Sequence, residues 1–283
     1  MPEWKASFIP YFTNNPQEAI DVLSRYGYAG VEWIGYLHFN TEEELKNLAA
    51  LTRKGGLEVA NIMCSSDLVV PDDAKRAERV KYTVDKISAA RAASIDKVNL
   101  FSGPADWDPA AQKIGKDFKE GAAWKNLVDS FNSIVAAAEK NDVTITFEAA
   151  FNMLVHDFYT LQEFLTYFHS KNLAVNLDPS HMVLCGNDVG YAVRRLGKRI
   201  QHVHMKDAVG KPGTQNENFM FPMLGEGVTD WKDFFDALNE VGYNGYLSVE
   251  FEAENYLRNV WQGDWAKAAE ASKMQLDRIT HLE

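Results

Sequence analysis

Four residues whose side chains can bind a metal lie near the ends of short segments in the second half of the chain: Glu148, Asp178, His204 and Glu250. Polar and apolar residues alternate in each segment, as in VTITFE, AVNLD, HVHMK and LSVEF. Because successive side chains of a β-strand point to opposite faces, all four residues lie on the polar face of their segment. Such polar faces on successive strands predict one shared site.

Three carboxylates and one imidazole form a ligand set made mostly of oxygen, which is typical of hard divalent cations. We expect Mn2+, with Mg2+, Co2+ and Zn2+ as alternatives. Without a cation, three ionised carboxylates in so small a space would repel one another by several kcal/mol.

The elements that must position these residues alternate along the whole chain. Short runs rich in β-branched residues, such as LEVANIM, precede longer segments with helical periodicity, which gives eight strand–helix units. Eight units without a linker predict one domain over residues 1–283, a (β/α)8 TIM barrel with long loops at the carboxyl ends of its strands. The alternative is a doubly wound open sheet, but its glycine-rich nucleotide motifs are missing after the first strand. Capping boxes are predicted at Thr41 with Glu44 and at Thr160 with Glu163.

The amino-acid composition of the chain limits the classes of molecule that it can bind. The chain has 283 residues, a net charge of -11 and two cysteines. An acidic protein lacks the basic surface that nucleic acids or anionic membranes require, so we expect neither partner. The absence of a signal-like or membrane-spanning segment and the low cysteine content predict a cytoplasmic protein with reduced thiols. The aromatic segment ENYLRNVWQGDW is a candidate interface for a homo-oligomer.

The motifs TFEAA, NLDPSH, HVHMKD, LGEGVTDW and GYNGYLSVEFE resemble the sugar isomerase/epimerase superfamily of xylose isomerase-like barrels. That superfamily includes ketose 3-epimerases, hydroxypyruvate isomerase, inosose dehydratase and, more distantly, endonuclease IV. The resemblance implies a divalent metal held by Glu148, Asp178, His204 and Glu250. It also implies that Glu148 and Glu250 transfer protons and that His181 contacts a carbohydrate substrate.

The reaction implied is isomerisation or epimerisation, in which a proton is removed next to a carbonyl and a metal stabilises the enediolate. The main alternative is a dehydratase or lyase acting on a keto-inositol or keto-sugar, which begins with the same step. An endonuclease IV-like hydrolase and a non-catalytic sugar-binding barrel are further alternatives. The hydrolase would need a basic face, which this acidic chain lacks. The sugar-binding barrel predicts that loss of the metal leaves function intact.

Further residues are candidates for substrate binding. They are Lys206, whose other predicted role is an ion pair with Asp207, together with Trp107, His38, Asn61 and Asn99. Ketose epimerases carry an arginine shortly after the metal-binding histidine, where this chain has Lys206 and Lys211. A lysine does not reproduce the arginine fork, which leaves the dehydratase open. The long segment from Asp207 to Val228 is expected to form a lid or binding loop.

Overall fold

Eight parallel strands close into a barrel in the order β1-β10-β7-β6-β5-β4-β3-β2, in a computed structural model that describes residues 4–104, 108 and 110–282. The predicted TIM barrel is therefore confirmed. The barrel strands are β1 (Lys5–Phe8), β2 (Gly30–Ile34), β3 (Glu58–Met63), β4 (Lys97–Leu100), β5 (Thr144–Glu148), β6 (Leu173–Leu177), β7 (Ile200–Met205) and β10 (Tyr246–Val249).

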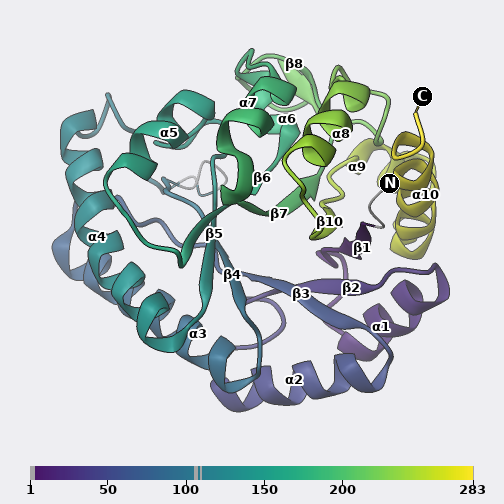
Figure 1. Ribbon diagram of the computed structural model, residues 1–283, viewed down its shortest axis with the longest axis horizontal. Coiled ribbons are helices and arrows are strands. Elements are labelled where there is room, and N and C mark those ends of the chain that lie inside the picture. Colours follow the sequence, from purple (N-terminus) through teal and green to yellow (C-terminus); the bar gives the residue numbers. More distant parts are fainter. Residues whose placement is uncertain (1–3, 105–107, 109, 283) are drawn as a thin grey trace.

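Helices surround the barrel, and Figure 1 shows α10 beside the N-terminal strand. This placement is supported by the ring of Phe8 in β1, whose centroid lies 6.5 Å from that of Trp265 at the start of α10. The helices are α1 (Pro16–Arg25), α2 (Glu42–Lys54), α3 (Asp73–Ala92), α4 (Glu120–Asn141), α5 (Phe158–Thr166), α6 (Pro179–Leu184), α7 (Val189–Leu196), α8 (Trp231–Glu240), α9 (Glu254–Asn259) and α10 (Trp265–Ile279), with a 3-10 turn at Gly197–Arg199. In the part of the chain that is described, no helix is both long and apolar enough to cross a membrane.

Two predicted capping boxes had different outcomes. The box at Thr41 and Glu44 opens α2 as expected. The box at Thr160 and Glu163 is wrong, because α5 begins earlier and Asp157 is its N-cap. Thr160 instead takes the third helical position, where it exchanges hydrogen bonds with Asp157.

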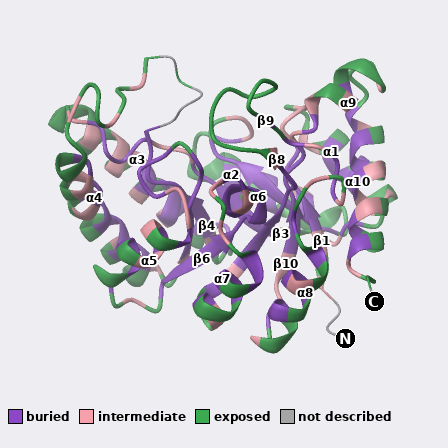
Figure 2. Cartoon of the chain, turned by 90° about the horizontal axis from the view of Figure 1, so that it is seen from above, coloured by how far each residue is buried: buried purple, intermediate pink, exposed green. Residues whose placement is uncertain are grey.

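The strand faces divide as the alternation predicts, and Figure 2 shows the buried strands enclosed by helices with exposed outer faces. On the outer face of β5, Phe147 stacks on Phe164 of α5 and meets Phe131 of α4 edge to face. On its inner face, Thr146 accepts a hydrogen bond from the amide of Asn61 across the barrel interior. The apolar layer between strands and helices thus forms the main core, while the barrel interior is polar.

The segment after β7 forms a small antiparallel hairpin, β8 (Val209–Gly210) with β9 (Phe219–Met220). Asp207 lies at its base and points away from the barrel interior. Its carboxylate accepts hydrogen bonds from the backbone of Gly225, Gly227 and Thr229 and from the indole of Trp231. These bonds tie the end of the long segment to its beginning.

Candidate metal centre

The four residues predicted as metal ligands converge at the carboxyl ends of their strands. The Nδ1 atom of His204 lies 3.3 Å from Oε2 of Glu148 and 3.3 Å from Oε2 of Glu250. One ligand atom from each of Glu148, Asp178, His181 and Glu250 lies within 4.8 Å of the others. His181 is thus as close to the carboxylates as a ligand would be, although the sequence pointed to it only as a substrate contact.

Unpartnered atoms indicate that the cluster suits a cation. Oε1 of Glu148, Oδ2 of Asp178 and Nδ1 of His204 are buried and have no hydrogen-bond partner among the described residues. A buried polar atom without a partner costs free energy, so such atoms usually serve a ligand or an ion. The donor set of carboxylate oxygens with one imidazole nitrogen therefore fits a divalent cation.

Local structure orients Asp178. It is the N-cap of α6, and its Oδ1 atom accepts a hydrogen bond from the backbone N–H of Ser180 at 2.8 Å. Pro179 occupies the first helical position, where it has no N–H to leave unpaired. With Oδ1 held by the helix, Oδ2 faces the cluster.

Two amides hold Glu148. Its Oε2 atom accepts from the side chain of Asn99 at 2.8 Å and from that of Asn176 at 2.9 Å. Asn99 was predicted to contact substrate, but the structure joins it to a predicted ligand instead. Sequence reasoning did not single out Asn176, although it lies on the polar face of β6, two residues before Asp178.

Glu250 is held by a phenol and an ammonium group. The hydroxyl of Tyr11 donates to its Oε1 at 2.7 Å, and Nζ of Lys206 donates to its Oε2 at 2.7 Å. Lys206 also lies 3.2 Å from Oδ2 of Asp178. The predicted pairing of Lys206 with Asp207 is therefore wrong, because Lys206 points to the cluster while Asp207 accepts from the backbone of Gly225 and Gly227. Tyr11 follows the end of β1, where strand alternation gives no direction.

A deeper network supports His204. Oε2 of Glu32 accepts from Ser248 at 2.9 Å and lies 2.7 Å from Nε2 of His202 and 3.2 Å from Nε2 of His204. Glu32, His202 and His204 also converge closely enough to hold an ion. We interpret them as a hydrogen-bonded network, since the contact between Glu32 and His202 has ordinary hydrogen-bond length. Glu32 thus fixes the ring that turns Nδ1 toward the cluster.

Electrostatics keep the two glutamates ionised. Burial by itself raises the pKa of a carboxyl group, but the charge of His204 and the close imidazoles of His181 and His204 lower the pKa of Glu148 below its usual value. For Glu250, Lys206 and His204 outweigh burial in the same way. Glu252, farther out, differs: burial raises its pKa to about 7.

A cavity of about 650 Å3 opens above the cluster. Its walls are largely aromatic and include Tyr11, Phe151, Phe221 and Phe251. His181 lies at the floor, its ring 5.4 Å from that of Phe151. Phe219 of the hairpin also lines the cavity.

Of the predicted substrate contacts, His38, Asn61 and Asn99 do not line this cavity. Both ring nitrogens of His38 contact backbone atoms, those of Ile34 and Thr13. Asn61 is buried deeper in the barrel, where its amide donates to Thr146. Trp107 lies outside the described residues.

Comparison with known proteins gives consistent matches over most of the chain. The sequence model of a family described as "Xylose isomerase-like TIM barrel" matches residues 20–277. An inosose dehydratase from Geobacillus thermodenitrificans is 24% identical over 260 residues, which cover 87% of this chain and 85% of the relative.

Solved structures share the fold. A D-psicose 3-epimerase from Clostridium cellulolyticum H10, solved with D-tagatose, superposes with a TM-score of 0.76 at 19% identity, covering 97% of this chain and 98% of that one. The IOLI protein with a binding zinc atom gives a TM-score of 0.78 at 18% identity, with 98% of each chain covered. At this level of identity the two structures support the fold alone.

Proposed function

The chain belongs to the xylose isomerase-like TIM barrel family, and from this premise we propose that it is a divalent-metal-dependent sugar isomerase or epimerase. It would move a proton at a carbon next to the carbonyl of a keto-sugar or related polyol. The observation that carries the proposal is the set of three unpartnered, buried ligand atoms on Glu148, Asp178 and His204, with Glu250 beside them.

These four residues would hold the metal, while His181 would contact the substrate. When bound, a divalent cation supplies Lewis-acid stabilisation of negative charge on the substrate oxygens. A mostly oxygen ligand set supports Mn2+ as the native ion, with Mg2+, Co2+ and Zn2+ as alternatives.

Glu148 and Glu250 would act as the proton-transfer pair. Glu148 is ionised and has one oxygen fixed by two amides, which leaves Oε1 free to take a proton. Glu250 is fixed through both oxygens, so its position relative to Glu148 is defined. A base and an acid on opposite sides of the substrate carbon are what epimerisation requires.

The remaining groups bind substrate and exclude water. His181 has a free Nδ1 atom, and its Nε2 lies 3.5 Å from Oε1 of Glu148, so the ring can reach a substrate oxygen beside that carboxylate. Lys206 lines the same cavity and can donate to a second oxygen. The aromatic walls lower the local dielectric and so strengthen these interactions.

A dehydratase is the second candidate, because the curated relatives at 24% identity include inosose dehydratases. It begins with the same proton removal and continues by expulsion of a β-hydroxyl group. The same residues would serve both reactions.

The test is proton exchange in deuterated water. The protein is loaded with Mn2+ and incubated with D-fructose, D-psicose, D-tagatose or an inosose, and the products are analysed by NMR. Deuterium next to the carbonyl without loss of water identifies an isomerase or epimerase, and loss of water identifies a dehydratase.

Variants provide the controls. Glu148→Gln is expected to slow exchange by about 100-fold or more, the usual contribution of a general base. Glu58→Gln, at an exposed position at the start of β3, is the matched control and leaves the rate unchanged. Exchange that survives Glu148→Gln or removal of the metal from folded protein would reject the proposal.

A further inference from the structure

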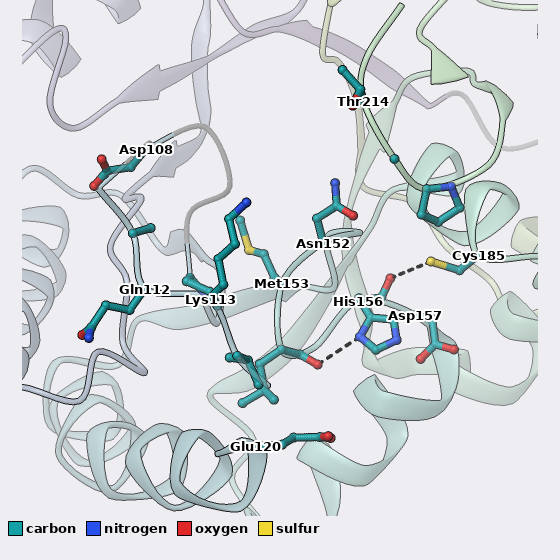
Figure 3. Close-up of a pocket in the computed structure, with 16 residues that line it drawn as sticks. Asp108, Gln112, Lys113, Glu120, Asn152, Met153, His156, Asp157, Cys185 and Thr214 are labelled. Atoms are coloured by element: carbon teal, nitrogen blue, oxygen red, sulfur yellow. Dashed lines mark hydrogen bonds between the residues drawn. The ribbon is translucent and has the colours of Figure 1, made fainter. Parts of the chain in front are cut away.

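A second cavity adjoins the one above the metal centre. It has a volume of about 1000 Å3 and lies on the side of the β5–α5 connection. Met153, Gly213 and Thr214 line both cavities, so the two meet along a shared wall. Figure 3 shows Met153 and Lys113 pointing into this outer cavity, with Asn152 and Thr214 at its rim.

The inner cavity alone is large enough for one sugar. Ligand cavities in proteins typically measure about 300–1,000 Å3, and the inner cavity of about 650 Å3 falls within that range. A single sugar bound at the carboxylates would therefore leave the outer cavity to water. The outer cavity therefore has room for a second part of a larger ligand.

The chemistry of the outer lining favours hydroxyl groups. Gln112, Asn152, Thr214 and Asp157 offer amide, hydroxyl and carboxylate groups that can donate to or accept from a polyol. Aliphatic surface from Met153 lies among them and can contact the C–H face of a sugar ring.

The same lining disfavours a phosphate. Lys113 is the one Lys or Arg among the described lining residues, and it shares the cavity with Asp108, Glu120 and Asp157. Three carboxylates would repel an anion more than one ammonium group attracts it. A purely apolar group could not exchange hydrogen bonds with the polar groups that line the cavity.

We propose that the substrate carries a second sugar unit, which binds in the outer cavity while the carbonyl-bearing unit binds at the metal centre. The inference rests on the proposed function, because it takes the inner cavity as the reaction site. It narrows the substrate class to keto-sugars of about disaccharide size.

The test compares affinities by calorimetry with the Mn2+-loaded protein. The probes are D-fructose and three keto-disaccharides that contain a fructose unit: lactulose, maltulose and isomaltulose. At least one disaccharide is expected to bind about tenfold more tightly than D-fructose, since two additional hydrogen bonds suffice for that factor.

Two neighbouring alanines provide a matched pair of variants. Ala111 lines the outer cavity, whereas Ala110 is exposed in the same turn and does not. Ala111→Trp fills the outer cavity and should abolish the preference for the disaccharide without changing the affinity for D-fructose. Ala110→Trp should change neither. Gln112→Ala, which adds no bulk, should weaken only disaccharide binding, by about threefold for one lost hydrogen bond.

Two results would overturn the inference: no disaccharide binds more tightly than D-fructose, or Ala111→Trp leaves the preference intact. The proposed function fails in a different measurement, the incorporation of deuterium. A protein that prefers the disaccharide but exchanges no proton would refute the reaction, not the second binding site.

Discussion

The Glu32→Gln variant tests whether the network beneath the metal centre orients His204. One oxygen of Glu32 contacts His202, His204 and Ser248. A glutamine keeps one acceptor oxygen but removes the negative charge, and its amide nitrogen, a donor, would replace the oxygen that lies 3.3 Å from Nε2 of His204. The ring of His204 would then lose the partner that fixes its tautomer and turns Nδ1 toward the carboxylates.

These contacts predict the size of two effects, one on metal affinity and one on folding stability. Loss of a carboxylate that supports a metal-binding histidine typically weakens metal affinity by about 10–100-fold. Breaking a buried ionic contact while leaving its partners in place costs about 3–5 kcal/mol of folding free energy. The first is measured by competition for Mn2+ with a fluorescent chelator, and the second by urea unfolding in excess chelator.

The control is again Glu58→Gln, which removes the same charge from an exposed position at the start of β3. It should leave the Mn2+ affinity unchanged. If Glu32→Gln binds Mn2+ within about twofold of the unaltered protein, well short of the usual effect of such a partner, the orienting role is refuted. A loss of folding stability alone would not rescue it, because any buried carboxylate could cause that.

Three further outcomes are expected. Lys206→Met leaves the carboxylate of Glu250 without its ammonium partner, so the metal-free protein should lose about 3–5 kcal/mol of unfolding free energy. Added Mn2+ should then raise the unfolding free energy more in the variant than in the unaltered protein. An equal rise in both proteins would contradict this. Gly227→Ala should cost about 1–3 kcal/mol, since the added Cβ would lie 2.1 Å from Oδ1 of Asp207; thermal unfolding measures it, and an unchanged midpoint would show that the segment simply shifts. Burial raises the pKa of Cys64 from 9.0 to about 12, so the unfolded chain releases that proton first and the unfolding free energy should fall as pH rises from 9 to 12. Urea titrations across that range should show a shallower fall for Cys64→Ala, and identical slopes would exclude the thiol.

Much of the barrel and of the candidate site could be predicted from strand alternation. The rule placed Glu148, Asp178, His204 and Glu250 on inner faces, and the structure brings them together. It succeeds because the strands of this barrel have an apolar face toward the helices and a polar face toward the interior, where Asn61, Thr146 and His202 are buried.

The same rule would have found Glu32, which alternates with the apolar Val31 and Trp33 in β2. Glu32 was not predicted because the alternation was applied only to the four strands that carry the predicted ligands. Tyr11 could not be found in this way, since it lies beyond the end of β1, where the backbone no longer alternates. Its contact with Glu250 depends on how the two ends of the chain meet around the closed barrel.

Asp207 connects the two ends of the loop that carries β8 and β9. It lies at the start of the loop, after β7, and its carboxylate accepts hydrogen bonds from Gly225, Gly227 and Thr229 at the end. What lies between is a closed module whose end is held to Asp207 through backbone N–H groups, which any sequence supplies. Phe219 and Phe221, which form part of the cavity wall, belong to that module. Under the proposed function, exchanging it with the corresponding loop of a relative would change part of the cavity wall without altering Glu148 or Glu250.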